Sequence, residues 1–338
     1  MERRNFLKYA AGAVTGACAL SIPQSARAES VPEEPQSGDA LNPDGIRVGG
    51  IRMISVCGGK YKVWTKRLGS GPVKVLLLHG GPGFPHDYME AMESFLPQAG
   101  IEMYYYDQLG VGNSDIPDDP ALWTLPRYLS EVEEVRRGLH LDQFVLYGHS
   151  WGGVLAMEYA LNYQQHLRGL VISNMTAGTQ SYLRHTAELK TKLLSKTSLA
   201  QFNALEAAKD YDNPAYDRIA MEELYPQDAL PVDSLARAGH ACHPAAQRKN
   251  LQPNAGQKRV RGHRKSQELG ARDRLHEIRV KTLTIGAAHD EMDPDDMVKM
   301  AKMMPNAASV ICPNGSHMDF WDDQAFYFQH LLAFLNSV

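Results

Sequence analysis

The stretch Gly148-His149-Ser150-Trp151-Gly152 decides the fold, because it stands between an apolar run at residues 144–147 and a helical pattern at residues 154–160. A strand, a Gly-x-Ser-x-Gly turn and a helix together make a nucleophile elbow. The glycines leave room for a strained turn, and the serine hydroxyl is exposed at the positive end of the helix. The stretch therefore predicts an α/β fold with Ser150 as a nucleophile, and an ordinary Gly/Ser turn is the alternative.

Length and composition restrict the class of protein. The chain has 338 residues, a net charge of -4 and 43% apolar residues, so one large domain or a domain with an insertion is expected. Nothing in this charge points to nucleic acid. No apolar run reaches the roughly 18 residues that cross a bilayer, so stable membrane insertion is not expected.

The N-terminus has the pattern of an export signal. The stretch Arg3-Arg4-Asn5-Phe6-Leu7-Lys8 resembles the twin-arginine motif, a weakly apolar stretch follows at residues 9–22, and Ala26-Arg27-Ala28 fits an A-x-A cleavage site. We therefore predict a signal peptide at residues 1–28, a mature start at Glu29, a linker at 29–43 and a periplasmic or secreted protein. A basic helix start is the alternative, and Cys18 is a candidate for lipid attachment.

The apolar runs after the linker follow the rhythm of a mostly parallel sheet. Residues 51–68 alternate around Gly58-Gly59 and predict an antiparallel hairpin. Buried parallel strands are predicted at residues 73–78, 103–106, 144–147, 170–173, 282–285 and 308–311, with helices between most of them. We expect an eight-stranded sheet with helices on both faces.

A long interval after residue 173 breaks this rhythm. It far exceeds what a crossover needs and predicts an inserted helical cap domain at residues 176–275. The core then comprises residues 44–175 and 276–338. A cap above the carboxyl ends of the strands would cover an active site there.

An elbow serine needs a base and an acid that follow it in the chain. Asp290 follows the strand at residues 282–285, and His317 follows the last strand, so they are the predicted acid and base. Asp293 is the alternative acid, although it fits a helix cap better. His330 is the alternative base, although it lies in a terminal helical pattern.

The Gly-rich loop His79-Gly80-Gly81-Pro82-Gly83 follows the first long strand and predicts an oxyanion hole. Trp151 supplies one N–H, and Gly81 is the second predicted donor because Pro82 has no N–H. Gly80 and Gly83 are candidate substrate contacts. A phosphate-binding loop is the alternative, but the Lys-Ser/Thr of a P-loop is lacking. The polar loop at residues 107–114 is expected to shape the floor of the site.

Five motifs in this order resemble the proline iminopeptidases and tricorn-interacting aminopeptidases of the α/β-hydrolase superfamily. They are HGGPG (79–83), DQLGVGNSD (107–115), GHSWGG (148–153), HDEMDP (289–294) and GSHM (315–318). The resemblance implies a triad of Ser150, Asp290 and His317 and removal of an N-terminal residue, often proline, from short peptides. It also implies that Glu291 anchors the substrate amine. A second anchoring carboxylate, within an Asn-Glu-Phe motif of the cap, is missing from this chain.

Residues 235–270 interrupt the resemblance. The segment is basic, lacks aromatic residues and has few large aliphatics, so it cannot bury a helix or strand face. Read in a neighbouring frame with permitted codons, it yields the missing Asn-Glu-Phe. Two compensating frameshifts are the favoured interpretation. A disordered basic loop and an anion-binding patch are the alternatives.

These observations predict a serine aminopeptidase that acts through an acyl-enzyme on a short peptide or amino-acid amide. No cofactor, metal or nucleic acid is expected, and the sequence leaves the oligomeric state open. An amide or ester hydrolase with the same triad is one alternative. A non-catalytic binding protein with a damaged cap is another.

Overall fold

A computed structural model describes residues 49–210, 213–224 and 271–338. The sheet strands are β1 (Ile51–Val56), β2 (Tyr61–Leu68), β3 (Val73–Leu78), β4 (Ile101–Tyr106), β5 (Phe144–His149), β6 (Leu167–Ser173), β7 (Thr282–Ala287) and β8 (Ala307–Cys312). The main core helices are η1 (His86–Ser94), α1 (Leu125–Gly138), α2 (Trp151–Tyr163), α11 (Pro294–Met303), α12 (Asp319–Asp322) and α13 (Gln324–Leu335). Short turns η2 (Pro97–Ala99), η3 (Pro120–Leu122) and η4 (Gln164–His166) join them.

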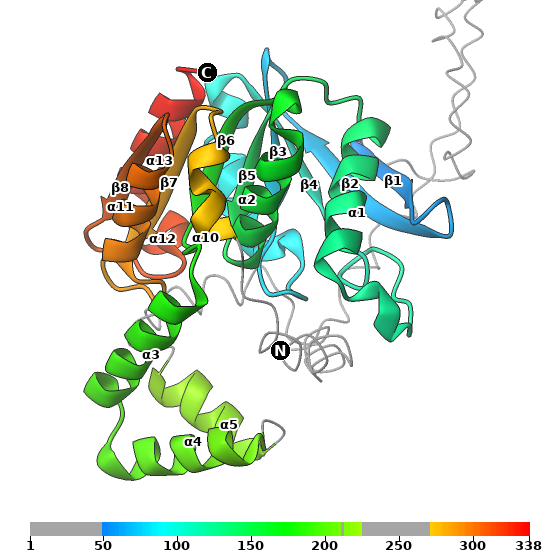
Figure 1. The fold of residues 1–338 in the computed structure, drawn as a ribbon. Helices are drawn as coiled ribbons and strands as arrows, with labels where there is room; N and C mark the ends of the chain where they lie inside the picture. Colours follow the sequence, from blue (N-terminus) through cyan, green and yellow to red (C-terminus); the bar gives the residue numbers. More distant parts are fainter. Residues whose placement is uncertain (1–48, 211–212, 225–270) are drawn as a thin grey trace, which may run out of the picture. The chain divides into compact units, whose positions relative to one another are not determined.

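The eight strands form one sheet in the order β1-β2-β4-β3-β5-β6-β7-β8 (Figure 1). The β1–β2 and β2–β4 pairs are antiparallel, and every pair from β4 to β8 is parallel. The carboxyl ends of the parallel strands therefore meet at one edge of the sheet, where α/β folds place their sites. The predicted eight-stranded, mostly parallel sheet is confirmed.

Helices cover both faces of this sheet because its strands are buried on both sides. Along β3, Leu76 and Leu78 pack into one hydrophobic cluster with α1 and α2, whereas Val75 and Leu77 pack into another with η1 and α13. This alternation is the period of two expected of a strand. Tyr104, Tyr105 and Tyr106 are buried in β4, as expected of the buried parallel strand predicted there.

The predicted strands agree with the observed strands to within a few residues at their ends. The hairpin divides at the expected turn, where Gly58 and Gly59 both have positive φ. The strands β4 to β8 extend one to three residues beyond the predicted ranges. The extension lies at the amino end in β4 and β6, at the carboxyl end in β5 and β7, and at both ends in β8.

Helices fill the described part of the segment between β6 and β7. They are α3 (Thr179–Leu193), α4 (Lys196–Ala208), α5 (Pro214–Arg218), the π-helix η5 (Ile219–Leu224), α10 (Ala271–Arg274) and η6 (Leu275–Glu277). The predicted boundaries of the cap stay a prediction. Residues 235–270, the signal peptide at 1–28 and the linker at 29–43 lie outside the described residues. No described helix combines the length and the hydropathy needed to cross a membrane.

Candidate active site

Ser150 lies on a sharp turn between β5 and α2. Its backbone angles are φ 54° and ψ −124°, which a non-glycine residue rarely adopts. A Cβ atom on Gly148 would lie 2.1 Å from the Gly152 carbonyl oxygen, and one on Gly152 would lie 2.1 Å from the Leu78 carbonyl oxygen. Only glycine fits either position, so the motif that predicted the elbow is required by its packing.

His317 and Asp290 are brought together by the loops that follow β8 and β7. The distance from His317 Nδ1 to Asp290 Oδ1 is 2.8 Å, and the Asp290 side chain is fully buried. The Met292 N–H donates to the same oxygen, and Asn174 Nδ2 donates to Oδ2 over 2.9 Å. Burial acts to raise the pKa of Asp290, but His317 and these hydrogen bonds outweigh it and lower that pKa.

Glu291 lies on the other side of the imidazole. Its Oε1 is 4.0 Å from His317 Nε2, and its side chain is 21% exposed. His317 therefore stands between a buried carboxylate and a partly exposed one. Burial acts to lower the pKa of His317, but Asp290 and then Glu291 outweigh it, so the pKa is raised above the usual histidine value.

The loop after β3 comes close to the elbow. A Cβ atom on Gly80 would lie 3.0 Å from Ser150 Cβ. Gly81 and Gly83 have φ angles of 114° and 105°, and a Cβ on Gly81 would lie 2.5 Å from the Gly83 nitrogen. Trp151 is the first residue of α2, where a backbone N–H has no acceptor within its own helix. The two predicted oxyanion donors thus lie at the same edge of the sheet, Gly81 in the loop after β3 and Trp151 at the start of α2.

Tyr88, which the sequence did not single out, links this loop to the elbow. The Gly80 N–H donates to the Tyr88 hydroxyl over 2.6 Å, and that hydroxyl lies 3.0 Å from His149 Nδ1. His149 Nε2 lies 2.8 Å from the His317 carbonyl oxygen. Gly80 therefore uses its N–H within the protein, and its predicted contact with substrate stays a prediction.

Gln108 connects the same two loops from the side of β4. Its side-chain amide donates to the His79 carbonyl over 3.0 Å and accepts from Trp151 Nε1 over 3.2 Å. The Gln108 N–H donates to His79 Nε2 over 2.9 Å. The polar loop at residues 107–114 thus supports the floor of the site, as expected, through side chains as well as turn geometry.

The helix α3, the first in the segment between β6 and β7, contacts the loop that carries Asp290. His185 Nε2 lies 3.0 Å from the Asp290 carbonyl oxygen, and Arg184 pairs with Asp293 over 3.3 Å. Asp296 accepts hydrogen bonds from Ser181 on α3 and from Arg272 on α10. The two ends of the described insertion therefore meet at one carboxylate of α11.

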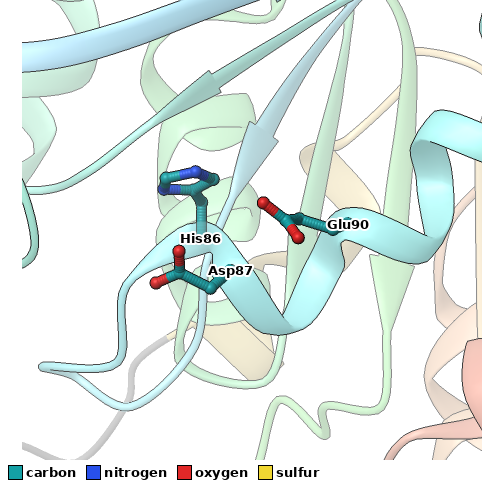
Figure 2. Close-up of side chains that lie close together, drawn as sticks. All are labelled: His86, Asp87 and Glu90. Atoms are coloured by element: carbon teal, nitrogen blue, oxygen red, sulfur yellow. The ribbon is translucent and has the colours of Figure 1, made fainter. Parts of the chain in front are cut away.

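A second group of titratable side chains lies at the start of η1. His86, Asp87 and Glu90 each offer a potential metal ligand atom, and these atoms lie within 4.8 Å of one another (Figure 2). His86 Nδ1 is already 2.7 Å from Asp107 Oδ1, and its ring stacks on Trp64 with centroids 4.4 Å apart. Burial acts to lower the pKa of His86, but Asp107 raises it overall, so the two form an ion pair that anchors the loop before η1.

Asp293 and His330, the alternative acid and the alternative base, make contacts outside the Asp290–His317 pair. Asp293 is the N-cap of α11 and accepts from the Asp295 and Asp296 N–H groups, as expected of a helix cap. His330 lies within α13, and its Nδ1 contacts the Phe326 carbonyl one turn earlier. Within the described part of the chain, neither residue forms a hydrogen bond or ion pair with the side chain of Asp290 or His317.

Asn174 is a further residue of this site that the sequence did not reveal. It follows β6 with a φ angle of 51°, and its side chain reaches Asp290. A usable signal existed, because a polar residue directly after a buried parallel strand lies at the edge where sites form. His149 carried a similar signal, since it lies inside the elbow motif itself.

The comparisons with known proteins agree with this fold. Residues 74–324 match the family model described as the alpha/beta hydrolase fold. A proline iminopeptidase of Elizabethkingia meningoseptica is 41% identical over 83% of this chain and 95% of its own length. The crystal structure of VinJ is 26% identical with a TM-score of 0.74, covering 86% of this chain and 99% of its own.

A crystal structure of a proline iminopeptidase of Mycobacterium smegmatis has the same fold, with a TM-score of 0.70 over 85% of this chain and 98% of its own at 22% identity. Fold and site thus define the protein as an α/β hydrolase. Within that class, the chain belongs to the proline iminopeptidase family.

Proposed function

We propose that this protein is a serine aminopeptidase that releases an N-terminal residue, preferentially proline, from short peptides. Ser150 is the nucleophile, His317 the general base and Asp290 the residue that orients the base. Gly81 and Trp151 donate to the oxyanion. The family to which the chain belongs supports this reaction.

The observation that carries the proposal is the placement of His317 between two carboxylates. Asp290 accepts a hydrogen bond from the Nδ1–H of His317, as a triad acid must. This bond fixes the tautomer in which Nε2 carries no hydrogen and can accept a proton. Glu291, at 4.0 Å from Nε2, is not needed by the triad. A carboxylate there provides a counter-ion for the charged amine of a substrate whose first residue is being removed.

The reaction follows from these positions. Ser150 Oγ attacks the carbonyl of the first residue while His317 Nε2 accepts the hydroxyl proton. The N–H groups of Gly81 and Trp151 stabilise the negative oxygen that forms. His317 then gives the proton to the leaving amine, and water hydrolyses the acyl-enzyme by the same steps in reverse order.

The test compares two substrates that differ only at the amine. Prolyl-naphthylamide should be cleaved, and N-acetylprolyl-naphthylamide should be cleaved at least roughly tenfold more slowly, since it cannot pair with Glu291. Equal rates would favour a general amidase or esterase. If neither is cleaved and a fluorophosphonate does not label Ser150, the protein is a non-catalytic binding protein.

The N-terminal sequence supports a further proposal on location. We propose export through the twin-arginine route, with cleavage after Ala28. Mass analysis of periplasmic protein should then find Glu29 at the N-terminus. A lipid-modified Cys18 would replace this with a membrane-anchored form.

A further inference from the structure

Asp319 is a buried carboxyl group near the proposed triad that the reaction does not require. It is the first residue of α12, two positions after His317, and its relative exposure is 0%. Within the described part of the chain it forms no ion pair with a lysine, arginine or histidine. A Cβ on Gly315 would lie 2.6 Å from Asp319 Cβ, so close packing against the preceding loop fixes its position.

Asn174 joins Asp319 to the proposed triad acid. Its Nδ2 donates to Asp290 Oδ2 over 2.9 Å and lies 3.3 Å from both Asp319 Oδ2 and the Ser316 carbonyl oxygen, which share its second hydrogen. Ser173 Oγ donates to Asn174 Oδ1 over 2.7 Å, which sets the orientation of the amide. One amide nitrogen is therefore shared between two buried carboxyl groups.

Two carboxylates in such a place cannot both hold a charge without a large electrostatic cost. Asp290 has an imidazole and a backbone N–H on one oxygen and Asn174 on the other. Among the described residues, Asp319 Oδ1 has no hydrogen-bond partner. The charge therefore belongs on Asp290. Burial first, and then the charge of Asp290, raises the pKa of Asp319 well above its usual value.

We propose that Asp319 is a positioning residue that stays uncharged in the working enzyme and holds Asn174 against Asp290. Its Oδ2 accepts the second amide hydrogen of Asn174, and its proton is carried on Oδ1. This arrangement fixes Asp290 Oδ2 without placing a second negative charge beside the catalytic base. The inference rests on the proposed triad.

Six other titratable groups interact electrostatically with Asp319 or lie beside it on the neighbouring elements. They are Asp290 after β7, His317 after β8, Cys312 in β8, Asp322 in α12, Tyr147 in β5 and Tyr327 in α13. His317 is the one member of this set that becomes cationic, and it pairs with Asp290. The surroundings therefore disfavour an ionised Asp319 throughout the working pH range.

The test uses Asp319→Asn, which has nearly the same shape and cannot ionise, and Asp319→Ala, which removes the contact. For Asp319→Asn we expect kcat, KM and the midpoint of the acid limb of kcat/KM to match the wild type. For Asp319→Ala we expect kcat to fall roughly ten- to a hundredfold at an unchanged KM, because a misplaced catalytic group slows the chemical step. Asp323→Asn, which removes a carboxylate that accepts the Asn314 N–H, serves as the control.

Several outcomes would overturn the proposal. A downward shift of the acid limb by about half a unit or more in Asp319→Asn means that the wild-type side chain is charged. Asp319→Asn as slow as Asp319→Ala means that the proton or charge itself is required, and a fully active Asp319→Ala means that no positioning occurs.

The deshielded proton between His317 and Asp290 in NMR spectra gives a readout without turnover and should persist in Asp319→Asn. If the wild type is inactive, the proposed function fails instead, which separates the two cases.

Discussion

His149 donates its Nε2–H to the backbone carbonyl of His317 over 2.8 Å, so the residue before Ser150 holds the loop that carries the proposed base. Because a carbonyl only accepts, the tautomer of His149 is fixed, and its Nδ1 accepts from the Tyr88 hydroxyl 3.0 Å away. That hydroxyl accepts from the Gly80 N–H. One chain of hydrogen bonds thus connects the oxyanion loop, the elbow and the base.

Replacing His149 should therefore disturb chemistry more than binding. We expect His149→Leu to lower kcat roughly ten- to a hundredfold with KM within twofold, because the His317 loop loses its support. Steady-state kinetics on prolyl-naphthylamide measure this. His166→Ala, at the amino end of β6 and so at the opposite edge of the sheet, is the control. A fall in both variants would point to general destabilisation.

Removing the proposed nucleophile or base should abolish most activity. We expect Ser150→Ala and His317→Ala each to lower kcat by roughly 10⁴-fold or more, because the two act as a unit. His330→Ala should remain close to the wild type, since its ring contacts its own helix. A Ser150→Ala protein that keeps more than about a tenth of the activity would rule out this nucleophile.

The sequence was sufficient for the sheet and for placing Ser150, Asp290 and His317 directly after their strands, because each lies where a local pattern ends. Their catalytic roles stay predictions. The apolar runs mark buried strands, and the elbow glycines are dictated by contacts below 2.5 Å with neighbouring carbonyls. The order Ser, Asp, His then follows from the order of the strands. No long-range information was needed for these assignments.

The supporting residues could not be derived in this way. Tyr88 has no distinguishing pattern in the sequence, and the place of Asn174 after a strand marks it only as a residue at the site edge. The partners of both depend on contacts between loops far apart in the chain. The partner of Asn174 depends on the β6–β7 pairing, which brings the ends of two strands together. Hydrophobic periodicity reports which face of a strand is buried, and carries no information on which polar groups meet at its end.

The kcat/KM of the enzyme should fall at low pH, and the midpoint of this fall should lie above the usual pKa of histidine. His317 must be neutral to accept a proton, and its pKa is raised by Asp290 and Glu291 against the effect of burial. Activity should therefore fall as the pH drops, with a midpoint in kcat/KM above about 6.5. A pH profile from about 5 to 10 on a substrate with a constant charge measures this. A midpoint below about 6 would contradict the proposed electrostatics.

Folding stability should depend on pH through His149. Burial lowers the pKa of this side chain to about 3, whereas an unfolded histidine titrates near 6.5. Between these values the unfolded chain binds the extra proton, so the stability contribution of His149 is lost as the pH falls through this window. Urea unfolding at about pH 7 and 5 should show a smaller loss of stability in His149→Gln than in the wild type. An equal loss in both proteins would show that His149 is protonated in the folded state.

Glu291→Gln should separate substrate recognition from the catalytic reaction. The amide keeps the shape and loses the charge that pairs with the substrate amine, so we expect kcat/KM for prolyl-naphthylamide to fall roughly ten- to a hundredfold, mainly through KM. At a pH above the acid limb, the residual rate on the N-acetyl substrate should not change. The acid limb should also move to lower pH, because Glu291 helps to raise the pKa of His317.

Glu277→Gln removes a carboxylate paired with Arg274 on the surface and is the matched control. If Glu291→Gln slows both substrates equally, Glu291 acts through His317 alone and another group must bind the amine.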